Sequence, residues 1–170
     1  MKPVSLKSDC ANCDALCCMA LAFDRSDMFA IDKPAGIACP NLQSDNKCKI
    51  HARLESEGFK GCINYDCAGA GQRVSQGLFA GRSWRDNAQT LSEMLEAFRG
   101  MRQVHERLVL LEAALRLPLS EPQKLERNAL LASILAPETW SPEDLAAYGQ
   151  SSSAKNITVF LKSLAGLVIR

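Results

Sequence analysis

The chain has 170 residues, 47% of them hydrophobic, and its 20 basic and 19 acidic side chains leave a net charge of +1. This length and composition suit one compact globular unit. Residues 1–80 carry nine basic and nine acidic side chains, and residues 81–170 carry eleven and ten. Neither part has the basic excess that neutralises phosphates, so we expect no nucleic-acid partner.

The first 80 residues are predicted to be rich in loops, because glycine, proline and an Asp-Asn step interrupt them at short intervals. Short helices are expected over residues 14–20, 49–57 and 70–79. Few apolar residues here recur at helical spacing, so burial alone would give a weak core. We expect a cross-link through the cysteines to supply much of the folding free energy of this part.

From residue 83 the sequence becomes strongly periodic. Ser83 followed by Asp86 is a capping pattern for a long helix, which Pro118 ends. An apolar stripe runs along this helix at helical spacing, and its members are Leu91, Met94, Leu95, Phe98, Met101, His105, Leu108, Leu111 and Leu115. The pattern predicts one long amphipathic helix.

Three further helices are predicted after Pro118. Ser120 with Gln123 begins the second helix, whose apolar face is formed by Leu125, Ala129, Leu130, Ile134 and Leu135. The third begins at Ser141, where a cap, a first-turn proline and two acids follow one another, and it ends at Gly149. The fourth covers residues 153–169. Short connections favour an antiparallel pair within a small bundle.

The predicted fold is therefore mainly α, with a small, loop-rich cysteine cluster, stapled by metal, packed against a helical bundle. We expect two regions: a cysteine-rich metal-binding region over residues 1–80 and a helical bundle region over residues 81–170.

The eight cysteines all lie in the first 67 residues, and the remaining 103 residues contain none. Cysteine normally occurs scattered as a small buried hydrophobe, so this clustering indicates a site built from thiols. We expect all eight to be metal ligands, namely Cys10, Cys13, Cys17, Cys18, Cys39, Cys48, Cys62 and Cys67. The alternatives are a disulfide scaffold or inert buried thiols.

The cellular compartment favours metal over disulfides. Residues 1–9 contain neither the apolar core nor the cleavage site of a signal peptide. The apolar stretch over residues 157–169 is broken by Lys162, Ser163 and Gly166 and is too short to span a bilayer. We expect a cytoplasmic protein without a membrane partner, and cytosolic thiols are kept reduced.

The spacing of the first four cysteines bears on how many metals are bound. On a helical turn Cys10, Cys13 and Cys17 share a face, whereas Cys18 lies about 100° further round. Cys18 is therefore expected to serve a second metal or to bridge two. Eight thiols match two four-cysteine sites, one polynuclear cluster, or an iron–sulfur cluster plus a zinc. Thiolates suit zinc and iron–sulfur clusters alike, so the cofactor is expected to be zinc or iron.

These motifs resemble a known bacterial family. The segments Cys10-x-x-Cys13-x-x-x-Cys17-Cys18, Cys39-Pro40 through Cys48-x-Ile50-His51, and Gly61-Cys62-x4-Cys67 are similar to the eight-cysteine, YkgJ-like domains described as zinc- or iron-chelating. Residues 29–36, 58–62 and 65–72 look like the cysteine-rich N-terminal region of certain bacterial pentapeptide-repeat proteins, although no pentapeptide array occurs here. The resemblance implies metal chelation by the eight cysteines.

Three classes of function remain open. The first is a metal-binding protein whose metal is structural and whose helical region binds another protein. The second is an iron–sulfur or thiol-based redox sensor, and the third is a metal-dependent enzyme with an open metal position. We favour the first and assign no catalytic residues, since eight thiolates would close both sites.

Three polar residues are given lesser roles. His51 is expected to pack or to form hydrogen bonds, although a ninth ligand is an alternative. Asp66 is expected to orient Cys67 or a backbone donor from outside the ligand set. His105 lies within the apolar stripe and is expected to be a buried histidine with satisfied hydrogen bonds.

Overall fold

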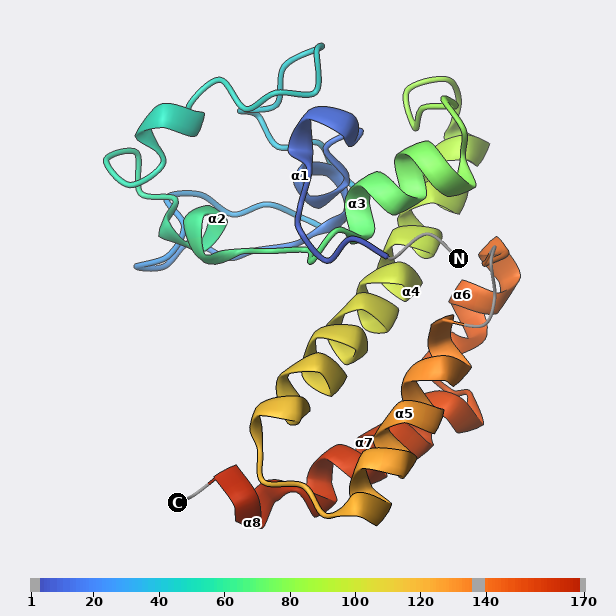
Figure 1. The fold of residues 1–170 in the computed structure, drawn as a ribbon. Coiled ribbons are helices and arrows are strands. Elements are labelled where there is room, and N and C mark those ends of the chain that lie inside the picture. The colour runs from blue at the N-terminus through green and yellow to red at the C-terminus, as the bar shows by residue number, and fades with distance from the viewer. Residues whose placement is uncertain (1–3, 136–139, 169–170) are drawn as a thin grey trace.

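The computed structural model describes residues 4–135 and 140–168, and it is mainly α as predicted (Figure 1). Within these ranges no strand forms, and β-type pairing is limited to three isolated antiparallel bridges: Phe23 with Lys33, Ser26 with Phe29, and Leu42 with Cys48. A group of loops and short helices lies at one end of the long helix α4 (Ala88–Ala113). The helices that follow α4 in the chain lie along it (Figure 1).

The cysteine-rich part contains only short helical segments. They are η1 (Cys10–Asn12), α1 (Leu16–Ala20), η2 (His51–Arg53), α2 (Lys60–Asn64), α3 (Ala70–Gln72) and η3 (Arg73–Leu78). The helices predicted over residues 14–20 and 70–79 are confirmed as α1 and as α3 with η3. The second of these is irregular, because η3 is a π-helix.

The helix predicted over residues 49–57 is wrong. Only the 3-10 turn η2 forms there, followed by further turns up to Gly58. Leu42 and Cys48 pair across a turn in which Asn46 has a positive φ, so residue 48 enters the segment in a bridge. The positive φ of 78° at Gly58 ends the segment. Helix α2 was not predicted.

The long helix α4 spans Ala88–Ala113 and continues as the 3-10 turn η4 (Ala114–Arg116). Its N-cap is Asn87, whose side chain accepts a hydrogen bond from the Thr90 amide, so the cap predicted at Ser83 is wrong. Ser83 and Asp86 instead form a separate turn, in which the Ser83 amide donates to the Asp86 carboxylate at 2.8 Å. The capping pattern of Ser83 and Asp86 thus forms a turn directly before the N-cap Asn87, and not the start of the helix.

Helix α5 (Glu121–Leu135) returns antiparallel to α4, as predicted (Figure 1). Helix α6 (Pro142–Tyr148) has the predicted cap at Ser141, which forms a capping box with Asp144. The predicted fourth helix is divided at Leu164 into α7 (Ser152–Ser163) and α8 (Ala165–Val168). Residue 169, the last in that prediction, lies outside the described residues.

Three apolar positions in the predicted stripes are wrong. Leu115 is 58% exposed and Leu125 is 71% exposed, and Ala129 is exposed as well. On α5 the buried position is taken by Arg127, whose Nε donates to the carbonyl oxygen of Leu111 on α4 at 2.7 Å. Periodicity places residues on a face of a helix, but neighbouring helices decide how much of that face is covered.

The main core is formed by α4 with α6 and α7, and its closest approach is at Gly100. A Cβ on Gly100 would lie 2.3 Å from the carbonyl oxygen of Leu145 on α6. Because no side chain separates the two backbones, α6 packs directly on α4. This core continues into the cysteine-rich part through Leu16, Ala70 and Val74, so α4 supports both regions.

The loop-rich region also has a small aromatic cluster of its own. The Phe23 and Phe29 rings stack with centroids 4.2 Å apart, and Phe59 meets Phe23 edge-on at 6.4 Å. The Phe29 ring occupies the space that a side chain at Gly61 would need. No helix in the described ranges combines the length and the apolar composition that crossing a bilayer requires.

Candidate metal centre

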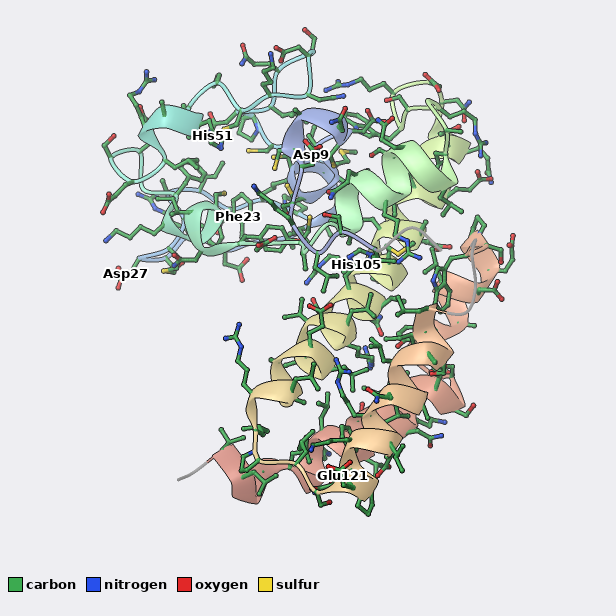
Figure 2. All side chains as sticks on the ribbon, viewed as in Figure 1. Asp9, Phe23, Asp27, His51, His105 and Glu121 are labelled. Atoms are coloured by element: carbon green, nitrogen blue, oxygen red, sulfur yellow. The ribbon has the colours of Figure 1, made fainter. Side chains whose placement is uncertain are left out.

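Each of the eight cysteines lies close enough to another for their charges to interact, and two of them, Cys17 and Cys18, lie in α1. Figure 2 shows yellow sulfur atoms beside α1. The cysteines arrive from well-separated parts of the chain, since Cys10 to Cys18 flank or form α1, Cys62 lies in α2, and Cys67 precedes α3. All eight are free thiols. The disulfide scaffold considered as an alternative is therefore not what this structure contains.

Four cysteines form an inner thiol group beside α3, namely Cys10, Cys13, Cys17 and Cys67. Three of them, Cys13, Cys17 and Cys67, pack against the main core. Gly71 in α3 makes room for two of the sulfurs, because a Cβ there would lie 2.7 Å from the Sγ of Cys13 and 3.7 Å from the Sγ of Cys67. The missing side chain thus leaves a cradle in which these sulfurs lie close together.

Burial and the charges of neighbouring cysteines raise the pKa values of Cys10 and Cys13 in the inner thiol group. Burial raises the pKa of Cys10, and the negative charges of Cys17 and Cys67 raise it further. Burial likewise raises the pKa of Cys13 to about 11, with the same two cysteines acting in the same direction. Each thiol therefore resists ionising beside ionised neighbours, which a bound cation would reverse.

The remaining four cysteines form an outer thiol group in the loops, namely Cys18, Cys39, Cys48 and Cys62. The Cys39 amide donates to the carbonyl oxygen of Cys18 at 3.0 Å, which brings two of them together. Burial raises the pKa of Cys62 to about 11, and the charges of Cys17, Cys39 and Cys48 add to this effect. The charges of Cys39 and Cys48 also raise the pKa of Cys18.

Cys17 and Cys18 connect the two groups. Their sulfurs lie 4.0 Å apart. The hydrogen bond between these two sulfurs lowers the pKa of Cys17 to about 7, and the Lys33 ammonium acts in the same direction. The same hydrogen bond is the largest cause of the raised pKa of Cys18. The lowered pKa favours the ionised form of Cys17, and its charge acts on members of both groups.

Cys67 has polar partners outside the thiol set. The Ser8 hydroxyl lies 3.1 Å from the Sγ of Cys67 and also donates to the Asp66 carboxylate. The same carboxylate accepts a hydrogen bond from the Ala68 amide at 2.7 Å. The predicted role of Asp66 is confirmed in this respect, since it fixes a backbone donor beside Cys67.

The two histidines have different positions. His105 on α4 is fully buried (Figure 2). Its Nδ1 lies 2.6 Å from the carbonyl oxygen of Ala68, and its Nε2 lies 3.3 Å from a guanidinium nitrogen of Arg73. It is thus a buried histidine with satisfied hydrogen bonds, as predicted. Burial lowers its pKa to about 4. His51 in η2 is exposed, so the packing role expected for it is wrong.

The thiols fit a soft metal in donor type, in number and in their grouping around α1. Their side chains do not converge on a closed site, however. Across residues 4–135 and 140–168, no three His, Cys, Asp or Glu side chains form a group that could hold a metal ion. The backbone therefore brings the cysteines into two neighbourhoods, and the sulfurs would have to turn inward to share an ion.

The chain is similar to an uncharacterized protein, YybG, of Bacillus subtilis (strain 168). The two are 44% identical over 117 residues, which is 69% of this chain and 42% of YybG. The chain thus spans less than half the length of that relative. No family model matches the chain, and no solved structure matches it.

Proposed function

We propose that the protein binds zinc or iron through its eight cysteines, and that the metal chiefly stabilises the cysteine-rich region. The observation that carries this proposal is the gathering of eight free thiols from distant segments around α1. Scattered buried cysteines would not be expected to meet in this way. The motif resemblance to YkgJ-like chelating domains supports the same assignment and extends it to all eight residues.

The physical case rests on what would otherwise hold this region together. Residues 4–80 contain helices of six residues or fewer and a small aromatic cluster. Isolated elements of this length are not stable in water. Metal binding by thiolates contributes folding free energy directly, of the order of 10–16 kcal/mol for structural zinc in small domains.

The decisive experiment is metal analysis of protein purified without oxygen, combined with a visible spectrum and thiol titration. We expect zinc or iron in stoichiometric amounts and eight thiols after the metal is released. A colourless zinc protein would favour the structural assignment, and absorption typical of an iron–sulfur cluster would favour the redox alternative. Folded protein that contains neither metal would contradict the proposal.

A redox or sensing role is the second candidate, and Cys17 is the observation that favours it. The lowered pKa of this thiol favours the thiolate, which is the form that oxidants attack. Oxidation there would remove a ligand and loosen the site. Mass spectrometry after mild peroxide treatment would find the first oxidised cysteine at residue 17, and uniform oxidation of all eight would contradict this assignment.

We also propose a protein partner for the helical region. Among the residues that the structure describes there, six large apolar side chains are exposed, namely Val109, Leu110, Leu115, Leu125, Val159 and Val168. Photo-cross-linking from residue 115 should capture a discrete partner that cross-linking from the exposed Glu55, in the loop region, does not. Equal capture from both positions would contradict a binding surface on the helices.

A further inference from the structure

Lys33 is a buried lysine, with 3% of its surface exposed, in a region that is otherwise mostly loops. Its backbone is fixed by two hydrogen bonds with Phe23, in which the Lys33 amide donates at 2.8 Å and the Phe23 amide donates at 3.0 Å. Its Nζ lies 5.8 Å from the centroid of the Phe23 ring. The side chain is thus held in place by the fold and is not a surface lysine that has folded back.

The hydrogen-bond partners of this ammonium are all neutral. Its Nζ donates to the backbone carbonyl oxygens of Met19 at 3.3 Å, Leu21 at 2.5 Å and Pro34 at 3.1 Å. In the part of the chain that the structure describes, no carboxylate oxygen lies within 4.0 Å of it. A buried cation without an anion is costly, and lysines in such sites are normally paired.

The titratable groups whose charge acts on Lys33 are cysteines. Met19 and Leu21, which accept from Nζ, lie one and three residues after Cys18 in the chain, and the Cys18 carbonyl oxygen accepts a hydrogen bond from the Cys39 amide. The ammonium is therefore placed at the C-terminal end of α1, next to the segment in which the two thiol groups meet. Burial lowers the pKa of Lys33, whereas the charges of Cys39, Cys18 and Cys17 oppose that change.

We propose that the Lys33 ammonium is the fixed counter-charge of the thiolates of Cys17, Cys18 and Cys39, and thereby a positioning residue for metal binding. This inference rests on the proposed function. A divalent ion bound by four thiolates keeps an excess of negative charge, and in a partly dry site that excess is stabilised by a nearby buried cation. Partners of this kind outside the ligand set tune the affinity of the metal.

A purely structural role for Lys33 makes a different prediction. Its three carbonyl partners include two at the end of α1, so the side chain also caps that helix. Capping requires a hydrogen-bond donor, whereas charge compensation requires a cation. Lys33→Gln keeps a donor and removes the charge, Lys33→Arg keeps the charge, and Lys33→Met removes both. Lys47→Gln makes the same charge change at a lysine that is 75% exposed, which provides the control.

The test is equilibrium competition for zinc between each full-length variant and a chelator of known affinity, with metal per chain and thermal unfolding measured alongside. We expect Lys33→Gln and Lys33→Met to bind zinc about 10- to 100-fold more weakly, while Lys33→Arg and Lys47→Gln stay close to the parent chain. Should Lys33→Met fail to fold, Lys33→Gln and Lys33→Arg decide the question between them.

Three results would overturn the inference. Wild-type affinity in Lys33→Gln would show that a donor suffices and that charge plays no part. Equal losses in Lys33→Gln and Lys33→Arg would assign the effect to packing. A parent chain that binds no metal would remove the proposed function itself, and the inference with it, and this outcome is recognised before any variant is compared.

Discussion

The Nδ1 atom of His105 lies 2.6 Å from the carbonyl oxygen of Ala68, the residue that follows Cys67. This contact joins the middle of α4 to the loop that carries a member of the inner thiol group. Ala68 has a positive φ of 50°, which is unusual for a residue with a side chain, so the loop is held in a strained shape by its neighbours. His105 is one of those neighbours.

His105 makes stability depend on pH in a defined direction. Its pKa is lowered to about 4 in the fold, so the unfolded chain takes up the proton first as pH falls. The contribution of the neutral ring is complete above the usual value of about 6.5 and is lost progressively towards pH 4, by up to about 3 kcal/mol. Urea unfolding at pH 7 and pH 4.5 would measure this loss.

His105→Gln is the comparison that isolates the histidine, since other groups also titrate in this range. The variant should be less stable than the parent chain at pH 7 by about 1–3 kcal/mol, because buried partners lose a hydrogen bond. The difference between the two proteins should shrink as pH falls through 6.5 towards 4. A difference that is constant with pH would contradict the assignment.

Gly71→Ala is predicted to impair metal binding more than folding. The added Cβ would lie 2.7 Å from the Sγ of Cys13 and 3.7 Å from the Sγ of Cys67, so the Cys13 sulfur must move from its present position. The matched control is Gly77→Ala in η3, where nothing lies within 4 Å of the added atom. Metal content and thermal unfolding of both variants should show a selective loss of metal at position 71. Equal metal content in the two variants would contradict the proposal that the space at Gly71 is needed for metal binding.

Cys17→Ser and Cys18→Ser are both predicted to lower metal content, and Cys17→Ser more strongly. The charge of Cys17 acts on thiols of both groups, whereas Cys18 belongs to the outer thiol group. Serine keeps the size of the side chain and removes the thiolate. If Cys18→Ser leaves metal content, spectrum and melting temperature unchanged, at most seven cysteines are ligands, and a partly open metal position becomes the better explanation.

Removal of the metal is predicted to act unevenly along the chain. The helices from α4 onward have an extensive core of their own, while the loops around the outer thiol group have few buried residues. Hydrogen exchange before and after chelation should show a large loss of protection over residues 10–67 and a smaller one over residues 91–135. A uniform loss would mean that the chain unfolds as a single unit, against the predicted division at residue 80.

Most of the helical half of the fold could be predicted from the sequence. Periodic leucines and proline or serine boundaries located α4 to α7 within a few residues, because local patterns and tertiary packing agree there. The exceptions are instructive. Leu125 and Arg127 both lie on α5, and only the position of α4 determines that the arginine is buried against the Leu111 carbonyl while the leucine is exposed.

The candidate metal centre could be predicted from the sequence only in part. Clustering of cysteines indicated that they belong together. The helical turn expected to place Cys10, Cys13 and Cys17 on one face is wrong, because Cys13 is extended between η1 and α1. The contributions of Gly71 and Lys33 were not foreseen, because both depend on contacts between segments far apart in the chain. The run of residues from Phe29 to Gly36 contained a signal for Lys33, since a lone lysine among apolar and small residues is a candidate for burial.

The packing of the inner thiol group on α4 has a consequence for synthesis of the protein. Every cysteine is synthesised before α4, yet Cys13, Cys17 and Cys67 pack against a core to which that helix contributes. At about 5–20 residues per second, the nascent chain carries eight unprotected thiols for several seconds. Delivery of a metal during that interval, or a reducing environment that persists through it, would decide how much of the newly made protein reaches its folded form.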